Sequence, residues 1–248
     1  MMLRSVNVIV LCLLMSQTAA LAQVSDWTQW GGPHRNFTSE TKGLAPSWPA
    51  AGPRRLWQRE LGEGYSAIAV ERGTLFTMYR KGDNEIAIAL DAATGKTLWE
   101  YSYAAPFSAG YDMSNGPGPH ATPLVIGNLV VTSGATGKLH CLDKKTGKLL
   151  WSHDLLSEFN GTLRVNGYSC SPIAYKDKIV MMVGGPSSSL IAFNQKDGSV
   201  SWKQHDFKNS TSSPIVINVD GQDQLVAFMY SDIVGVDPNN GNLLWSHP

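Results

Sequence analysis

One eleven-residue pattern occurs four times in the sequence, and this repeat limits the possible folds more than any other feature. Each copy has a small residue first, Asp or Asn third, Thr, Asp or Asn sixth, Gly seventh and Trp eleventh. The copies are ALDAATGKTLW (89–99), CLDKKTGKLLW (141–151), AFNQKDGSVSW (192–202) and GVDPNNGNLLW (235–245). The tryptophans are 52, 51 and 43 residues apart. A repeat of this length is typical of β-propellers, in which each unit forms one sheet.

The residue types within each copy predict two strands joined by a tight turn. A polar residue followed by Gly suits such a turn, because Gly accepts a positive φ and the polar side chain bonds the turn backbone. We expect the Asp or Asn at the third position to bond the same turn from its other side. The apolar run before the turn, such as 86–90, indicates a buried strand. A further strand pair precedes it, as at 122–132, so each unit is predicted to contain four antiparallel strands.

The sequence therefore predicts an all-β protein, a β-propeller of four-stranded antiparallel blades with about four blades present. Each repeated Trp is expected near the outer strand, where it would fill the gap between neighbouring blades. Full burial of one such indole is worth about 2–3 kcal/mol. The residues assigned to this structural docking are Trp57, Trp99, Trp151, Trp202, Trp245, Gly95, Gly147, Gly198 and Gly241.

One further segment matches the outer strand but has no blade before it. LWQREL (56–61) resembles LWSHDL (150–155) and the Leu-Trp pair at 244–245. We interpret it as an orphan closing strand of an incomplete ring, whose full form would have seven or eight blades. The domain boundaries that follow are an N-terminal extended segment at 23–55 and a propeller domain at 56–248. Open blade edges would favour aggregation.

The pattern Ala-x-Asp-x-x-Thr-Gly-x-x-x-Trp resembles the tryptophan-docking motif of quinoprotein-type propellers, here called the PQQ-like repeat family. The segment DWTQWGGPHR (26–35) resembles the start of secreted proteins with such repeats. This resemblance covers residues 26–248 and implies two kinds of function. Some members are alcohol or sugar dehydrogenases that use pyrroloquinoline quinone (PQQ) and Ca²⁺. Others, like the barrel-assembly lipoprotein of the outer membrane, are non-catalytic scaffolds.

The sequence of residues 1–22 predicts a cleavable signal peptide. An apolar run at 8–15 follows Arg4, and Ala20-Leu21-Ala22 offers small residues for cleavage before Gln23. The run is too short to span a bilayer. We therefore expect a periplasmic or secreted protein that does not span the membrane. A formal net charge of zero argues against nucleic-acid binding.

The starts of the innermost strands should converge on one rim of the channel. Tyr65, His120, Tyr168 and Ser213 are the candidate binding residues there, with Asp112 and Arg164 in two long inter-blade loops. The alternative interpretation is structural: small hydroxyl side chains fit the narrow space near the channel, and Pro stands at a strand position where the missing N–H is tolerated. The loops could equally be plain connections.

No residue is assigned to catalysis, to a cofactor or to a metal. His153, His205 and His247 follow repeat tryptophans on diverging outer strands, so they are interpreted as surface residues rather than metal ligands. Cys141 and Cys170 are interpreted as small buried residues, although one disulfide is conceivable. We expect a binding or scaffold module with a protein, peptide or carbohydrate partner in the cell envelope and no cofactor. The alternative is a dehydrogenase that depends on PQQ and Ca²⁺.

Overall fold

The computed structural model describes residues 26–43, 45–107, 116–164 and 167–248. It confirms the predicted all-β class: four sheets each contain four antiparallel strands that are neighbours in sequence. The first sheet comprises β1 (Ala69–Glu71), β2 (Thr74–Lys81), β3 (Asn84–Asp91) and β4 (Thr97–Ala104). The second comprises β5 (Leu124–Ile126), β6 (Leu129–Ser133), β7 (Lys138–Asp143) and β8 (Leu149–Asp154). The third comprises β9 (Ile173–Tyr175), β10 (Lys178–Gly185), β11 (Ser188–Asn194) and β12 (Val200–Gln204). The fourth comprises β13 (Ile215–Val219), β14 (Gln222–Phe228), β15 (Ile233–Val236) and β16 (Leu243–His247).

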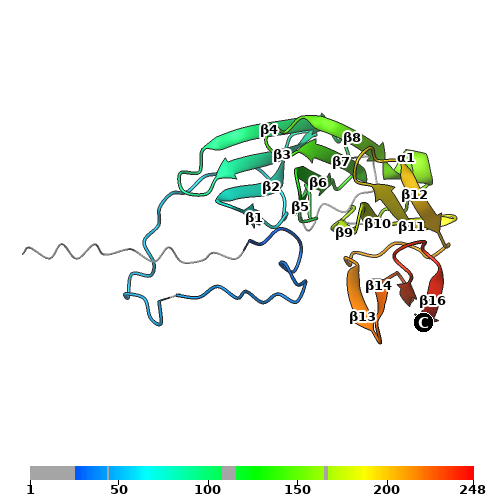
Figure 1. The fold of residues 1–248 in the computed structure, drawn as a ribbon. Helices are drawn as coiled ribbons and strands as arrows, with labels where there is room; N and C mark the ends of the chain where they lie inside the picture. Colours follow the sequence, from blue (N-terminus) through cyan, green and yellow to red (C-terminus); the bar gives the residue numbers. More distant parts are fainter. Residues whose placement is uncertain (1–25, 44, 108–115, 165–166) are drawn as a thin grey trace, which may run out of the picture.

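The sheets follow one another along an arc, as successive propeller blades do (Figure 1). Short first strands such as β1, β5 and β9 lie on the inner side of the arc, and last strands such as β4 and β8 lie on the outer side. A short helix, α1 (Leu155–Phe159), begins the connection from the second sheet to the third. It was not predicted. The Asp154 side chain caps its first turn by accepting hydrogen bonds from the backbone N–H groups of Leu156 and Ser157.

The register explains why each repeat begins with a small residue. Across the last two strands of each sheet, the Trp lies opposite that residue; the pairs are Ala89–Trp99, Cys141–Trp151, Ala192–Trp202 and Gly235–Trp245. The pairing then shifts by one residue, so that Leu90 pairs with Thr97. This β-bulge re-aims the strand beside the Trp. A larger cross-strand neighbour would compete with the indole for the same space.

The turn within each repeat forms as predicted. Asp91 accepts hydrogen bonds from the backbone N–H and the hydroxyl of Thr94, at 2.8 and 2.6 Å. These bonds lower the pKa of the Asp91 carboxyl, with the Thr94 hydroxyl as the main cause. In the third sheet Asn194 takes the Asp position, and Asp197 instead bonds the backbone N–H of Ser199 at 2.9 Å. Glycines at the seventh position have φ between +69° and +79° in all four copies.

Four of the five docking tryptophans are bonded to the turn of the next sheet. The indole N–H donates to a backbone carbonyl there; the pairs are Trp57–Ala92, Trp99–Lys144, Trp151–Gln195 and Trp202–Pro238, at 2.8–3.1 Å. The ring covers the turn glycine so closely that a Cβ on Gly147 would lie 2.6 Å from Trp99. The docking glycine is therefore required for its backbone conformation and for its lack of a side chain.

A second anchor accompanies three of these tryptophans. Arg59, His153 and His205 each donate a hydrogen bond to the carbonyl of the docking glycine in the next sheet, at 3.1, 2.8 and 2.7 Å. The interpretation of His153 and His205 as mere surface residues is therefore wrong. They lie two or three residues after the Trp, where the strand still follows the neighbouring turn. His247, on the last strand, is exposed.

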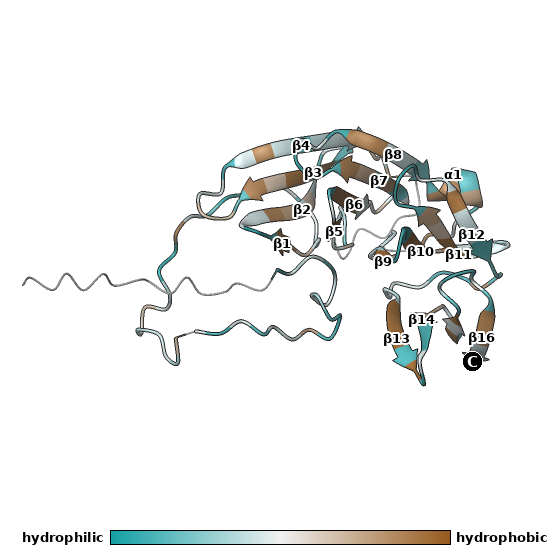
Figure 2. Ribbon diagram, in the orientation of Figure 1, coloured by the Kyte–Doolittle hydropathy of each residue, from teal (hydrophilic) through white to brown (hydrophobic). Residues whose placement is uncertain are grey.

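Apolar side chains fill the spaces between the sheets, and middle strands such as β7 are largely brown in Figure 2. The main core includes Trp151, Trp202 and Phe193, and a second core between the first two sheets includes Trp99. Cys141 and Cys170 are buried and unbridged, and burial raises the pKa of each thiol to about 12.

The first and last docking tryptophans differ from the others. Trp57 makes the docking contact with the first sheet, but residues 56–61 belong to none of the strands in the described part of the chain. The predicted orphan strand is thus present as a docking segment without a paired ladder. Trp245 is 37% exposed, bonds Gln224 of its own sheet at 2.6 Å and covers Gly235.

A buried polar cluster joins the first two sheets at their other end. The Glu85 side chain is fully buried and accepts hydrogen bonds from the hydroxyl of Tyr103 at 2.7 Å and from the backbone N–H of Ala135 at 3.0 Å. The buried Arg80 lies 3.9 Å from the same carboxyl. Desolvation raises the pKa of Glu85, against the lowering effect of these partners. A side chain on Gly134 would collide with Glu85, so the cluster also needs a glycine beside it.

His140 completes this cluster from β7. Its ring lies 4.1 Å from that of Tyr103 and 5.3 Å from that of Tyr101, measured between centroids. Its Nδ1 has no hydrogen-bond partner among the described residues. Burial, helped by the charge of Lys138, lowers the pKa of His140 from 6.5 to about 4.

We expect Gly147→Ala to destabilise the chain more than Gly127→Ala. Both glycines have a positive φ, but a Cβ on Gly127 meets nothing within 4 Å, whereas one on Gly147 meets the Trp99 ring. The backbone cost, about 1–2 kcal/mol, is shared. The clash should add about 1–3 kcal/mol for Gly147→Ala. Urea unfolding of both variants measures the difference. Equal losses of unfolding free energy in the two variants would show that a Cβ on residue 147 does not clash with the Trp99 ring.

The buried His140 should make stability depend on pH. Because its folded pKa lies below its unfolded value, its contribution is complete above pH 6.5 and is lost as pH falls toward 4. Between pH 7 and pH 5 the wild type should lose about 2 kcal/mol more than His140→Phe. Urea unfolding at the two pH values tests this, with His247→Gln as the exposed-histidine control that keeps the wild-type difference. A parallel loss in His140→Phe would exclude His140 as the cause.

Candidate binding site at the channel rim

The starts of the inner strands are linked around the arc by side-chain hydroxyls. Ser66 donates to the carbonyl of Ala121 at 2.8 Å. Ser171 accepts from the backbone N–H of Thr122 at 3.0 Å, and Ser213 accepts from that of Ser171 at 2.9 Å. Thr122, Ser171 and Ser213 each precede a proline. At Ser171 and Ser213 the hydroxyl before the proline therefore connects neighbouring sheets, which supports the structural interpretation of Ser213. The Thr122 hydroxyl is buried and has no hydrogen-bond partner among the described residues.

The N-terminal segment lies along the same inner strands. Trp27 pairs with Val70 of β1, and the carbonyl of Thr28 accepts from the N–H of Val125 in β5 at 2.7 Å. This dark blue segment is visible beside β1 in Figure 1. The inner edges of the first two sheets are thus covered by the protein's own chain.

Arg35 extends this cover to the third and fourth sheets. Its guanidinium donates to the carbonyls of Pro172 and Pro214, at 3.2 and 2.6 Å, and to the Gln29 side chain at 3.0 Å. Burial lowers the pKa of Arg35 to about 10. One guanidinium with several donors suits this role, because it can bridge two carbonyls from different sheets.

A pocket of about 360 Å³ opens where this segment meets the strand starts. We call it the rim pocket; it is lined by Trp30, His120, Ser169, Ser171, Thr211, Ser212 and Ser213. The lining offers one indole, one imidazole and five hydroxyls, and no side chain with a fixed charge. The Trp30 side chain is 39% exposed and packs edge-on against Phe37. Such a pocket can stack on a flat or apolar group and exchange hydrogen bonds with polar ones.

Tyr65 and His120 extend the rim pocket outward. Their rings are stacked, with centroids 5.4 Å apart and planes 6° from parallel. Tyr65 is 65% exposed and lies against Gly116. Desolvation lowers the pKa of His120, so its imidazole stays neutral at pH 7 and can both donate and accept. The structure thus brings together three of the six predicted rim residues, Tyr65, His120 and Ser213.

Two of the other three predicted residues, Tyr168 and Arg164, do not line the rim pocket. Tyr168 is only 1% exposed and its hydroxyl donates to the carbonyl of Met182, so its assignment to the rim surface is wrong. Its ring is large enough to fill the core between strands, which the sequence pattern did not reveal. Arg164 lies over the Tyr230 ring, 4.3 Å from its centroid. Asp112 falls outside the described residues.

Sequence reasoning missed Trp30 and Arg35 as parts of this site. Both lie in DWTQWGGPHR, which was noted only for its resemblance to other proteins. The available signal was an unusual density of Trp, Gly and Arg before the first repeat. Nothing in that pattern indicates which sheets the segment contacts.

The rim pocket is a poor match for the PQQ and Ca²⁺ that the resemblance implies. Ca²⁺ prefers carboxylate and amide oxygens, and none of the seven lining residues carries either group. Among the described residues, no cluster of three or more His, Cys, Asp or Glu side chains could hold a metal ion. Cys141 and Cys170 are not adjacent in sequence and cannot form a vicinal pair.

Two curated relatives represent the two functions that the repeat implies. Over 131 residues the chain is 29% identical to the quinoprotein alcohol dehydrogenase PedH of Pseudomonas putida, covering 50% of this chain and 20% of the relative. Over 161 residues it is 25% identical to the outer membrane protein assembly factor BamB of Moranella endobia, covering 60% of this chain and 37% of the relative. The chain therefore spans well under half of either relative.

The fold is shared with solved propellers. The quinohemoprotein alcohol dehydrogenase of Comamonas testosteroni is 14% identical and matches with a TM-score of 0.59, over 90% of this chain and 41% of that structure. A europium-containing methanol dehydrogenase matches with a TM-score of 0.53 and 18% identity, over 74% of this chain and 41% of that structure. At these identities the likeness establishes the fold alone.

The family described as outer membrane protein assembly factor BamB matches residues 48–131 and 82–248, which together include all four docking turns. The matched ranges span most of the chain, and the repeats they contain are those that the docking tryptophans connect. This chain belongs to that family of PQQ-like repeat propellers.

Proposed function

We propose that the chain is a non-catalytic binding module of the cell envelope, periplasmic or secreted, that engages a protein, peptide or carbohydrate partner. The observation that carries this proposal is the rim pocket beside the exposed Tyr65–His120 pair. Its aromatic and hydroxyl lining without fixed charges suits recognition. Membership of a family described by an assembly factor of the outer membrane is consistent with it.

Tyr65 is the residue on which a partner would depend most. Exposed aromatic rings supply large contact areas with little conformational entropy to lose, so they dominate many binding interfaces. Stacking on His120 already restricts the Tyr65 ring. The partner would therefore meet a preorganised aromatic surface, which lowers the entropy cost of binding.

The proposed location rests on the sequence. The predicted signal peptide, residues 1–22, lies outside the described residues. In the part of the chain that is described, no helix is long and apolar enough to cross a membrane.

The second candidate function is a dehydrogenase dependent on PQQ and Ca²⁺. The similarity to PedH favours it, and the lining of the rim pocket does not. The two candidates differ in one direct measurement, because bound quinone has its own absorbance band and supports dye-linked alcohol oxidation.

We expect Tyr65→Ala to weaken binding of a rim partner by about 30-fold, the effect of losing one aromatic hot-spot residue. Periplasmic extract passed over the immobilised chain would supply the partner, and affinity would then be measured with the purified partner. Trp48→Ala removes another aromatic ring, 63% exposed and not part of the rim pocket, and should leave affinity unchanged.

Equal losses in the two variants would contradict a role for the rim. A quinone absorbance band with alcohol oxidation after addition of PQQ and Ca²⁺ would replace the binding proposal by the dehydrogenase.

A further inference from the structure

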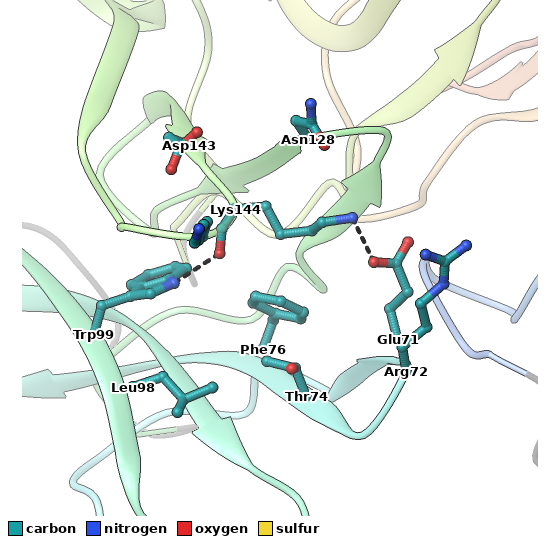
Figure 3. A pocket seen from close by; sticks show the side chains of 10 residues that line it. Glu71, Arg72, Thr74, Phe76, Leu98, Trp99, Asn128, Asp143 and Lys144 are labelled. Carbon is teal, nitrogen blue, oxygen red and sulfur yellow. Dashed lines mark hydrogen bonds and ion pairs between the residues drawn. The ribbon is translucent and has the colours of Figure 1, made fainter.

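A second pocket lies between the first and second sheets, at the end where β1 turns into β2 and so opposite to the strand starts of the rim. Its volume is about 390 Å³. We call it the inter-sheet groove; its lining residues are Glu71, Arg72, Thr74, Phe76, Leu98, Trp99, Asn128, Asp143, Lys144 and Lys145. Figure 3 shows the Phe76 ring in the groove, with the Lys144 side chain extending across it toward Glu71.

The apolar part of the groove consists of three side chains from the first sheet. Phe76 and Trp99 are buried and lie 6.0 Å apart, measured between ring centroids. Leu98 is the extra residue of the β-bulge in β4, and its side chain is 54% exposed. A flat apolar group could therefore gain contact with Leu98 and the edges of the two rings.

The equivalent space between the second and third sheets is lined differently. By register, Glu71 and Thr74 correspond to Ile126 and Leu129 of the second sheet, which pack against the main core. Lys144 corresponds to Gln195, whose side chain bonds the carbonyl of Lys176 of its own sheet at 2.8 Å. The Glu71–Lys144 wall of the inter-sheet groove is thus not repeated between the second and third sheets. The space between the third and fourth sheets is polar as well, but there Lys176 is bonded to Asn239 at 2.7 Å.

The charges of the groove leave an excess of cations. Glu71 and Lys144 form a half-buried ion pair with a 2.5 Å Nζ–Oε2 contact, and Lys144 also bonds the carbonyl of Gly127. Asp143 is engaged by the backbone N–H and the hydroxyl of Thr146 in its own turn.

The remaining charged side chains, Arg72 and Lys145, are both exposed and both positive. No hydrogen bond or ion pair of either side chain is recorded within the described residues. Besides the hydrogen bonds from Thr146, which are the main cause, Lys145 acts electrostatically on Asp143 and contributes to lowering the pKa of that carboxyl. With three cations and two carboxylates, the groove has a net charge of +1, so an anionic group entering it would be attracted.

We propose that the inter-sheet groove binds a small aromatic carboxylate. The aromatic ring would lie against Leu98, Phe76 and Trp99. The carboxylate would pair with Arg72 or Lys145 at the exposed mouth of the groove. This site is independent of the rim pocket and of the function proposed for it.

The probe is 3-phenylpropionate, compared with 3-phenylpropionamide, which has the same ring without the charge. Titration calorimetry should show saturable binding of the acid and about fivefold weaker binding of the amide. The indole N–H resonance of Trp99 should shift with the acid, because that N–H bonds the Lys144 carbonyl beside the groove. No saturable binding, or equal binding of acid and amide, would overturn the proposal.

Two variants locate the site. Thr74→Leu places the larger side chain of the second sheet in the groove without changing its charge, and should abolish binding while the sheets still dock. Arg72→Gln with Lys145→Gln changes only exposed side chains and should weaken binding about tenfold. Lys196→Gln is the control, because Lys196 is the counterpart of Lys145 in the third sheet; it should bind like the wild type, as should Tyr65→Ala. Wild-type affinity in Thr74→Leu and in the Arg72→Gln, Lys145→Gln double variant would exclude the groove.

Discussion

The hydrogen bonds from four docking indoles to the next sheet hold the whole arrangement together. A four-stranded sheet of this size buries only part of its apolar surface by itself, so each sheet depends on its neighbours. The indole N–H cannot be left unpaired in the space between sheets without a free-energy cost. Bonding it to the carbonyl of the adjacent turn satisfies the N–H and also fixes the distance and tilt of the next sheet. The bulge, the small residue opposite the Trp and the turn glycine all serve this one contact.

The inner side of the arc is held together by different groups. Small hydroxyls before the prolines link the strand starts, and the N-terminal segment covers the inner edges with backbone pairing and with Arg35. Exposed strand edges invite pairing with other chains. Covering them with the protein's own segment removes that hazard and leaves Trp30, Tyr65 and His120 at the opening. The position of a binding surface thus follows from how the edges are protected.

Much of the fold could be predicted because the repeat records local chemistry four times. The turn bonds of Asp91 and Asp143 and the positive φ of the turn glycines depend on residues within eleven positions of one another, and each strand pairs with a strand next to it in sequence. The site could be predicted only in part. His120 and Tyr65 follow from their place at strand starts, whereas the burial of Tyr168 depends on how the third sheet packs. Arg35 acts through contacts 137 and 179 residues away in sequence, and no local pattern can specify such partners.

The acceptor of every docking bond is a main-chain carbonyl. The residues that supply it are Ala92, Lys144, Gln195 and Pro238. These four differ in size, charge and even in the ability to donate a backbone hydrogen bond. The side chain at that position can therefore vary during evolution without loss of the docking hydrogen bond. A propeller of this kind can therefore have different residues lining the groove between each pair of sheets, while the docking bonds stay the same.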